Sequence, residues 1–157
     1  MPEKSTAPQL FGDLLARARL SWVRQMASRL EGLGYSQYRR SDALVLRLLL
    51  CGPLPVGRLG SVLGVTRQAA RKAVDGLALR GYARTERDAE DSRKLNVVLT
   101  PRGEAYARAV VEVIEALNRE LSERLDPAQL SAAAAVLQTV ITGDGDTDET
   151  RHSPHRS

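Results

Sequence analysis

The most restrictive feature of the sequence is a change in the spacing of apolar residues at Gly81. Before it, apolar residues recur every three or four positions, which predicts a helix over 67–80 that Thr66 caps and Gly81 ends. After it, apolar residues alternate with polar ones, which predicts strands over 82–86 and 95–99 around a charged turn. A capped helix that leads directly into a hairpin restricts the chain to few folds.

Five further helices are predicted from helical spacing and from residues that start or stop helices. The first covers residues 11–33 and ends at Gly32 and Gly34, the second runs from its N-cap Ser41 to Cys51, and the third runs from Pro55 to Leu63 and ends at Gly64. The fourth is capped by Thr100 and starts at Pro101. The fifth starts at Asp126, Pro127 and Gln129. On the last helix, we expect Leu130, Ala134, Leu137 and Ile141 to face inward. The first helix is apolar along its length, so it should pack on a long helix of its own chain or of a second one.

The order of the central elements is typical of a winged helix-turn-helix. A short helix, a tight turn at Gly64-Val65, a basic amphipathic helix and a hairpin follow one another. In this architecture the second helix of the unit enters the major groove of DNA. We therefore predict a mainly α fold with a small β-hairpin wing and long N- and C-terminal helices.

The positive charge of the chain is concentrated in its middle third. Residues 54–103 hold ten Lys or Arg and five Asp or Glu, a net charge of +5, whereas the rest of the chain carries a net charge of −1. Such a local surplus is expected where a protein meets phosphates, and on charge alone a solvated basic surface is an equally good explanation. On the helix predicted over 67–80, Arg67 and Arg71 are neighbours, and a ligand of negative charge would relieve their repulsion.

The composition excludes most catalytic and metal sites. Both histidines, His152 and His155, lie in the last six residues, and Cys51 is the single cysteine, so no intrachain disulfide or thiolate cluster can form. We expect no cofactor, no metal and no enzymatic activity. No run approaches the roughly 18 apolar residues of a membrane span, and no secretory signal is recognised, which predicts a cytoplasmic protein without a membrane partner. Cys51 follows three leucines, so we expect it to be buried and inert.

The predicted wing resembles that of the MarR family, the multiple-antibiotic-resistance regulators. The resemblance rests on Asp91-Ser92-Arg93, the aliphatic strand over 95–99 and Leu99-Thr100-Pro101-Arg102-Gly103. Gly52-Pro53-Leu54, the run from Leu59 to Thr66, and Gly81 are also similar to the family. The detailed similarity covers residues 40–103. Ala89 and Thr85 depart from the proline and the arginine that the family often has at these positions.

The resemblance implies a cytoplasmic transcription repressor that binds an inverted-repeat operator in double-stranded DNA as a homodimer. It also implies that a small anionic or phenolic effector releases the DNA. The chain would then comprise a flexible N-terminus (1–8), an N-terminal dimerisation helix and joint (9–39), a winged helix-turn-helix DNA-binding domain (40–100), C-terminal dimerisation helices (101–142) and a disordered tail (143–157).

The candidate DNA-binding residues lie on the helix over 67–80 and on the wing. By position, Gln68, Arg71 and Lys72 are candidates for base edges, and Thr66 and Arg67 for phosphates near the helix start. Arg93 is expected in or over the minor groove with Asp91 paired to it, unless that pair is only a structural salt bridge of the hairpin. Arg87 and Lys94 are expected to contact the DNA backbone.

Three interpretations remain open from the sequence alone. Tyr35 and Tyr38 could line an effector pocket, although packed and hydrogen-bonded tyrosines are the better explanation of both. A winged-helix module that binds a partner protein is the alternative to a DNA-binding regulator, and exposed apolar residues on the helix over 67–80 would favour it. An enzyme would have to rest its active site on carboxylates alone.

Overall fold

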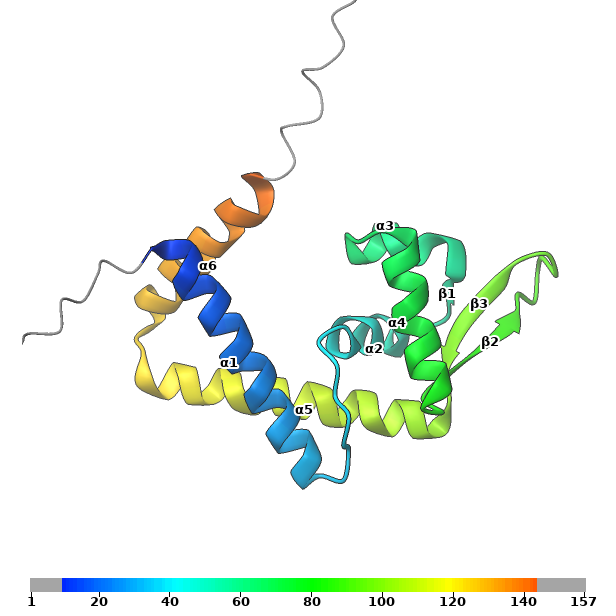
Figure 1. Ribbon diagram of the computed structural model, residues 1–157, viewed down its shortest axis with the longest axis horizontal. Coiled ribbons are helices and arrows are strands. Elements are labelled where there is room, and N and C mark those ends of the chain that lie inside the picture. The colour runs from blue at the N-terminus through cyan, green and yellow to red at the C-terminus, as the bar shows by residue number, and fades with distance from the viewer. Residues whose placement is uncertain (1–9, 144–157) are drawn as a thin grey trace, which may run out of the picture. The chain divides into compact units, whose positions relative to one another are not determined.

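The computed structural model describes residues 10–143. This part holds six α-helices, one short 3-10 helix and a three-stranded sheet (Figure 1). The elements are α1 (Phe11–Gly32), α2 (Asp42–Leu50), β1 (Leu54–Pro55), η1 (Val56–Arg58), α3 (Leu59–Leu63), α4 (Arg67–Leu79), β2 (Ala83–Arg87), β3 (Leu95–Leu99), α5 (Pro101–Arg124) and α6 (Pro127–Thr142). The predicted mainly α fold with a hairpin wing is confirmed.

The predicted tails lie almost entirely outside the described residues. Only Gly143, the C-cap of α6, is described; residues 1–8 and 144–157, with His152 and His155, are not.

The chain divides after Glu115 into two compact units. The first contains α1 through β3 and the beginning of α5, and the second contains the remainder of α5 together with α6. Within residues 10–143, every helix is too short or too polar to cross a lipid bilayer.

A tight turn joins α3 to α4. Gly64 ends α3 with a left-handed φ of 63°, a conformation that glycine adopts most easily. Thr66 then caps α4, because its Oγ1 accepts a hydrogen bond from the backbone N–H of Ala69 at 3.1 Å. A Cβ on Gly60 would lie 3.1 Å from the carbonyl oxygen of Val65, so α3 packs closely on this turn. The cap and stop residues predicted here are confirmed.

The sheet is antiparallel with the order β1-β3-β2, and β2 and β3 form the wing. Ala83 lies opposite Leu99 in the hairpin, and Leu54 of β1 lies opposite Val97 of β3. The helix predicted over 55–63 therefore begins too early, since its first residues belong to β1 and η1. A strand of two residues shows no alternation in sequence, and its proline is tolerated because β1 is an edge strand.

The core of the first unit lies between α2, α4, the sheet and the first turns of α5. Its members are almost fully buried: Val45, Leu46, Leu49, Leu59, Ala70, Val74, Leu77, Val97, Leu99, Tyr106 and Val110. Ala70, Val74 and Leu77 are the inward face expected for α4, and their burial confirms it. Burying each larger aliphatic side chain contributes about 1.5–3 kcal/mol before conformational entropy is subtracted.

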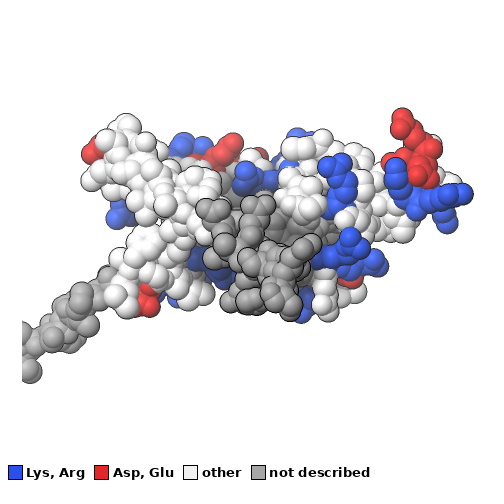
Figure 2. Space-filling model, turned by 90° about the horizontal axis from the view of Figure 1, so that it is seen from above, with Lys and Arg blue, Asp and Glu red and all other residues white. Residues whose placement is uncertain are grey.

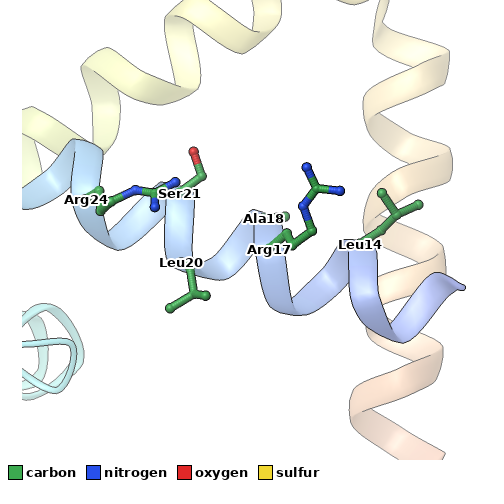
Figure 3. A pocket seen from close by; sticks show the side chains of 6 residues that line it. All are labelled: Leu14, Arg17, Ala18, Leu20, Ser21 and Arg24. Carbon is green, nitrogen blue, oxygen red and sulfur yellow. The ribbon is translucent and has the colours of Figure 1, made fainter. Parts of the chain in front are cut away.

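The first helix, α1, is buried only toward its C-terminal end. Met26 and Leu30 are fully buried, whereas Phe11 and Leu14 near its start are exposed. A shallow hollow runs along this exposed part and is lined by Leu14, Arg17, Ala18, Leu20, Ser21 and Arg24 (Figure 3). Arg17 and Ser21 project from one side of α1 and Leu20 from the other (Figure 3). The single chain therefore leaves large apolar side chains in the first half of α1 uncovered.

The last helix, α6, begins as predicted but does not bury the predicted face. Asp126 and Gln129 form a reciprocal capping box at its start. Of the side chains expected to face inward, Leu130 is half-buried and Ala134, Leu137 and Ile141 are exposed. No residue of α6 is buried, so the prediction of an inward face is wrong for the isolated chain.

The prediction for Cys51 is wrong, and Ser41 holds the predicted N-cap position of α2 without capping it through its side chain. Cys51 is exposed rather than buried, because it lies just beyond the last residue of α2, with its Sγ 3.5 Å from the carbonyl oxygen of Arg47. Ser41 makes no side-chain capping bond, because its backbone is already helical. The carboxylate of Asp42 instead accepts a hydrogen bond from the backbone N–H of Arg39 at 2.9 Å.

Candidate nucleic-acid interface

The outward face of α4 carries the residues that the sequence singles out for DNA contact. The opposite face of α4 is buried in the core, and this face points outward. All five candidate residues at the start of α4 are exposed: Thr66, Arg67, Gln68, Arg71 and Lys72. Arg71 donates a hydrogen bond from Nε to Asp75 at 3.1 Å, and both side chains are more than half exposed. An exposed pair of this kind contributes little stability, so Arg71 can exchange Asp75 for another anion at small cost.

Asp88 organises the turn at the tip of the wing. Its carboxylate accepts hydrogen bonds from the backbone N–H groups of Glu90 and Asp91, at 2.9 and 3.0 Å, and from the side-chain amide of Asn96 at 2.7 Å. These bonds, that from Asn96 most strongly, lower the pKa of Asp88. The turn therefore has a defined shape despite its high content of charge.

The expected ion pair between Asp91 and Arg93 is replaced by other contacts. Asp91 Oδ1 accepts a hydrogen bond from the backbone N–H of Arg93 at 3.1 Å, and Oδ2 lies 3.6 Å from Nζ of Lys94. A carboxylate two residues away in a tight turn reaches the backbone more easily than the guanidinium. Within residues 10–143 no ion pair involves Arg93, so its exposed guanidinium is free for an external anion. Arg87 closes the wing by donating to the carbonyl oxygen of Ser92 at 2.7 Å.

The turn at Val56 and Gly57 joins two shallow hollows. One hollow is lined by these two residues with Arg67, Gln68 and Arg71 of α4. The other is lined by the same two residues with Pro55, Arg58, Arg93, Lys94 and Leu95. Since both hollows share Val56 and Gly57, the start of α4 and the wing lie on either side of this turn. Figure 2 shows Lys and Arg side chains over this end of the molecule, with an acidic group at the far end of the wing.

Arg58 belongs to this surface and was not among the candidates from the sequence. It is exposed at the end of η1 and lines the hollow that also contains Arg93 and Lys94. The only signal in the sequence was its membership of the basic segment 54–103. The prediction that residues 55–63 are a single helix obscured that Arg58 stands beside the wing. The five cations Arg58, Arg67, Arg71, Arg93 and Lys94 with Gln68 are called the basic strip below.

A buried ion pair anchors the C-terminal end of α4. Arg80 donates hydrogen bonds of 2.8 Å from Nη1 and Nη2 to the two carboxylate oxygens of Asp42, which is 1% exposed. Tyr106 of α5 donates from its hydroxyl to Asp42 Oδ2 at 3.0 Å. Hydrogen bonding to Asp42 raises the pKa of Arg80, and burial followed by the charge of Asp42 raises the pKa of Tyr106. Three segments of the first unit thus meet on one carboxylate, a contact that the sequence did not reveal.

The two tyrosines proposed for an effector pocket have structural surroundings. The ring of Tyr35 stacks on that of Tyr106 with 4.9 Å between centroids. Tyr38 is half-buried, and its burial followed by the charge of Asp42 raises its pKa. These contacts account for both residues by packing, and a role in binding an effector stays a prediction.

The winged helix region matches a known family. Residues 36–94 match the sequence model of the MarR family. Residues 36–94 are called the MarR-family domain below, after the model that they match. Two uncharacterised proteins, one of Mycobacterium bovis and one of Mycobacterium tuberculosis, are each 30% identical over 88 residues, which are 56% of this chain and 62% of theirs. The match therefore spans less than two thirds of the length of these relatives.

Solved structures resemble the chain over a longer range than this MarR-family domain. A probable transcriptional regulator from Pseudomonas aeruginosa is 21% identical, with a TM-score of 0.69 over 84% of this chain and 97% of that one. The MepR–DNA complex of S. aureus is 16% identical, with a TM-score of 0.72 over 86% and 98%. The repressor CouR, bound to a 23-mer DNA duplex, is 24% identical, with a TM-score of 0.69 over 84% and 92%. At these identities the likeness shows a common fold.

Proposed function

We propose that this chain is a transcription regulator that binds double-stranded DNA. The observation that carries the proposal is the basic strip, in which the start of α4 and the wing present cations on both sides of the Val56–Gly57 turn. A helix of this kind enters the major groove in helix-turn-helix proteins. Two similar structures, those of MepR and CouR, are complexes with DNA, which supports the same partner for this chain.

The individual roles follow from position on α4, on η1 and on the wing. Gln68, Arg71 and Lys72 would contact base edges in the major groove, where a good bidentate pair contributes about 1–3 kcal/mol of discrimination. Arg93 would lie in or over the minor groove. Thr66, Arg67, Arg87, Lys94 and, as an addition from the structure, Arg58 would contact phosphates, which position a protein without reading sequence.

We propose a homodimer as the active form. Phe11 and Leu14 of α1 and Leu137 and Ile141 of α6 are large apolar residues that the single chain leaves exposed, and a second copy would cover them. In such a dimer residues 9–39 and 101–142 join the copies, and residues 40–100 bind half-sites about 34 Å apart on an inverted repeat. Sedimentation equilibrium at micromolar concentration tests this proposal, which a strictly monomeric protein would overturn.

Regulation by a small molecule extends the proposal. The chain would act as a cytoplasmic repressor, which a small anionic or phenolic effector releases from DNA. An effector can change operator affinity only by binding unequally to the competent and incompetent states. An effector could bind the two states unequally at the segment with Tyr35 and Tyr38, which leads into α2. A thermal-shift screen of small anions and phenols tests this part independently of DNA.

The central experiment is a fluorescence anisotropy titration with promoter fragments at several salt concentrations. If the basic strip neutralises phosphates, log affinity falls linearly with log salt, with a slope of about −0.9 for each phosphate contacted. We expect a steep slope and a preference for specific fragments over a random duplex. A flat salt response with equal binding to random DNA contradicts the proposal.

A winged-helix module that binds a partner protein is less well supported. Such a module would present an apolar surface on α4, but the large apolar residue exposed on this helix is Leu79, at the end away from the basic strip. The rest of the outward face is charged, polar or small. The family and the fold are those of transcription regulators rather than enzymes.

A further inference from the structure

The outward face of α4 holds one acidic residue, Asp75, among its cations. Asp75 lies one helical turn beyond both Arg71 and Lys72, so either could be its partner by spacing. The structure pairs it with Arg71, whose Nε lies 3.1 Å from Oδ1 and 3.3 Å from Oδ2 of Asp75. Within residues 10–143 the other arginine of this helix, Arg67, forms no ion pair. The two arginines of α4 therefore differ in their surroundings.

The guanidinium of Arg71 is held at Nε and not at its outer end. In the described part of the chain, neither Nη1 nor Nη2 of Arg71 has a hydrogen-bond partner. These two nitrogens form a planar fork, which matches the two acceptors O6 and N7 on the major-groove edge of guanine. Arg71 also lines the hollow that contains Gln68 and the Val56–Gly57 turn. Arg71 can therefore present its fork to a base edge while it keeps its bond to Asp75.

The carboxylate of Asp75 also affects which acceptor Arg71 prefers. It is as exposed as Arg71 itself, so a phosphate brought to this guanidinium would be repelled by a second negative charge. A base edge carries no net charge and meets no such repulsion. Arg67 lines the same hollow without an acidic partner in the described residues, so a phosphate suits Arg67 better. Asp75 thus favours a base over the DNA backbone at Arg71.

We infer that Asp75 is a positioning residue, which orients Arg71 so that the protein reads a guanine in its DNA site. An arginine side chain has many rotamers, and ordering it on binding is costly unless it is already ordered in the free protein. The bond from Nε to Asp75 supplies part of that order before DNA arrives. The inference rests on the proposed function, because Arg71 reads a base only if the chain binds DNA.

Selection of binding sites from a library of random duplexes shows which bases the full chain prefers. In the wild type we expect one guanine to be enriched at least about fivefold over the other bases, the low end for one bidentate pair. Arg71→Ala should abolish this enrichment. Asp75→Asn keeps Arg71 but removes the charge that holds it, and should reduce the enrichment to about twofold or less, because a neutral acceptor binds a guanidinium about half as strongly.

Asp75→Asn should at the same time bind a random duplex more tightly than the wild type. Arg71 is then free to contact a phosphate, so the salt slope should become steeper by about 0.9. Glu104→Gln is the matched control, since it removes the same charge from an exposed pair of the same spacing, with Arg108 on α5. It should leave the guanine enrichment and the salt slope unchanged. A residue with only a structural role would not lower specificity while raising non-specific affinity.

A guanine analogue with carbon in place of N7 tests the contact at a single atom. The analogue pairs normally with cytosine but removes one of the two acceptors that the fork of Arg71 needs. At the enriched position it should weaken binding of the wild type by about threefold or more, the worth of one hydrogen bond, and have no effect on Arg71→Ala. Equal binding of the two duplexes by the wild type overturns the assignment of guanine to Arg71.

Nuclear magnetic resonance of the free protein tests the orienting contact without DNA. The Nε–H group of Arg71 should be less mobile on the picosecond to nanosecond scale than that of Arg67, which has no ion pair in the described residues. Asp75→Asn should remove this difference, and Glu104→Gln should preserve it. Equal mobility of the two groups in the wild type overturns the positioning role of Asp75.

The outcomes separate this inference from the proposed function. If Asp75→Asn and Glu104→Gln both keep the wild-type enrichment and salt slope, the inference is overturned and the proposed function stands. If a cytosine is enriched instead, lost in Asp75→Asn and kept in Arg71→Ala, then Asp75 reads a base itself and the positioning role is wrong. If the chain binds no DNA, the proposed function and the reading of guanine both fail, and the mobility measurement still decides whether Asp75 orients Arg71.

Discussion

Arg80 and Asp42, 38 residues apart in sequence, are joined by two hydrogen bonds of 2.8 Å in the buried interior of the first unit. The side chain of Asp42 is fully enclosed, and that of Arg80 is 9% exposed. A charge removed from water in this way is tolerated because its partner satisfies it completely. The pair therefore connects the end of α4 to the start of α2 more firmly than apolar contacts alone.

Arg80→Gln should destabilise the protein strongly. The substitution leaves the carboxylate of Asp42 buried without a cation, and breaking a buried pair in this way costs about 3–5 kcal/mol. Urea denaturation followed by circular dichroism measures the loss. Arg84→Gln, which removes the partner of exposed Glu86, is the control and should cost no more than about 1 kcal/mol. Similar costs for the two variants would show that the Asp42–Arg80 pair is not structurally important.

Stability should fall at alkaline pH because of Tyr106. Its pKa is raised in the folded state, so above pH 10 the unfolded chain releases this proton while the folded protein keeps it. The contribution is complete below about pH 10, the ordinary value for tyrosine, and decreases as pH rises above it. Urea denaturation from about pH 8 to about pH 11 should show a free energy of unfolding that falls as pH rises, and Tyr106→Phe should make this slope smaller. If Tyr106→Phe has the same slope as the wild type, Tyr106 is not the cause. Tyr38, whose pKa is also raised, is then the next group to substitute.

Two substitutions on the basic strip should have different effects on DNA binding. Arg71→Ala should relax preference between promoter fragments by about 1–3 kcal/mol, because it removes a candidate contact to base edges. Lys94→Ala should weaken binding to all sequences alike and reduce the salt slope by about 1. Anisotropy titrations against a specific and a random duplex measure both. If both variants lose affinity without any change in preference, α4 is not the element that reads sequence.

Gly103 should not tolerate a side chain. A Cβ at this position would overlap the carbonyl oxygen of Tyr82, which is backbone and cannot rotate away. We expect Gly103→Ala to lower stability by at least about 1–3 kcal/mol, the usual cost of overpacking. Gly32→Ala, where no atom lies within 4 Å of the new Cβ, is the control and should be neutral or slightly stabilising. Equal melting temperatures for the two variants would contradict this account of the start of α5 packing on the backbone of Tyr82, just before β2.

Features that depend on neighbouring residues were predictable from the sequence. The Thr66 cap, the glycine stops at Gly64 and Gly81, and the capping box at Asp126 each use residues within a few positions of one another. The outward face of α4 followed directly from its period of 3.6. The basic segment indicates the same face, so the sequence alone predicts the candidate residues on α4.

Features that depend on distant partners were not predictable. Asp42, Arg80 and Tyr106 are far apart in sequence, and nothing local distinguishes this arginine from those on the basic strip. The pocket lined by Leu44, Val65 and Ala73 likewise forms only when α2 and α4 pack together. The exposure of Ile141 on α6 was missed for another reason, since an apolar residue in a periodic helix is normally assigned to the core of its own chain.

The carboxylate of Asp42 accepts hydrogen bonds from the loop before α2, from the end of α4 and from α5. These bonds fix the angle between α4 and α2. To swing α4 relative to α2, the protein would have to expose an unsatisfied charge, which is costly in a buried site. We therefore expect residues 40–100 to travel as a rigid body, so that a change in DNA affinity arises from altered surface charge or from the separation between two such bodies.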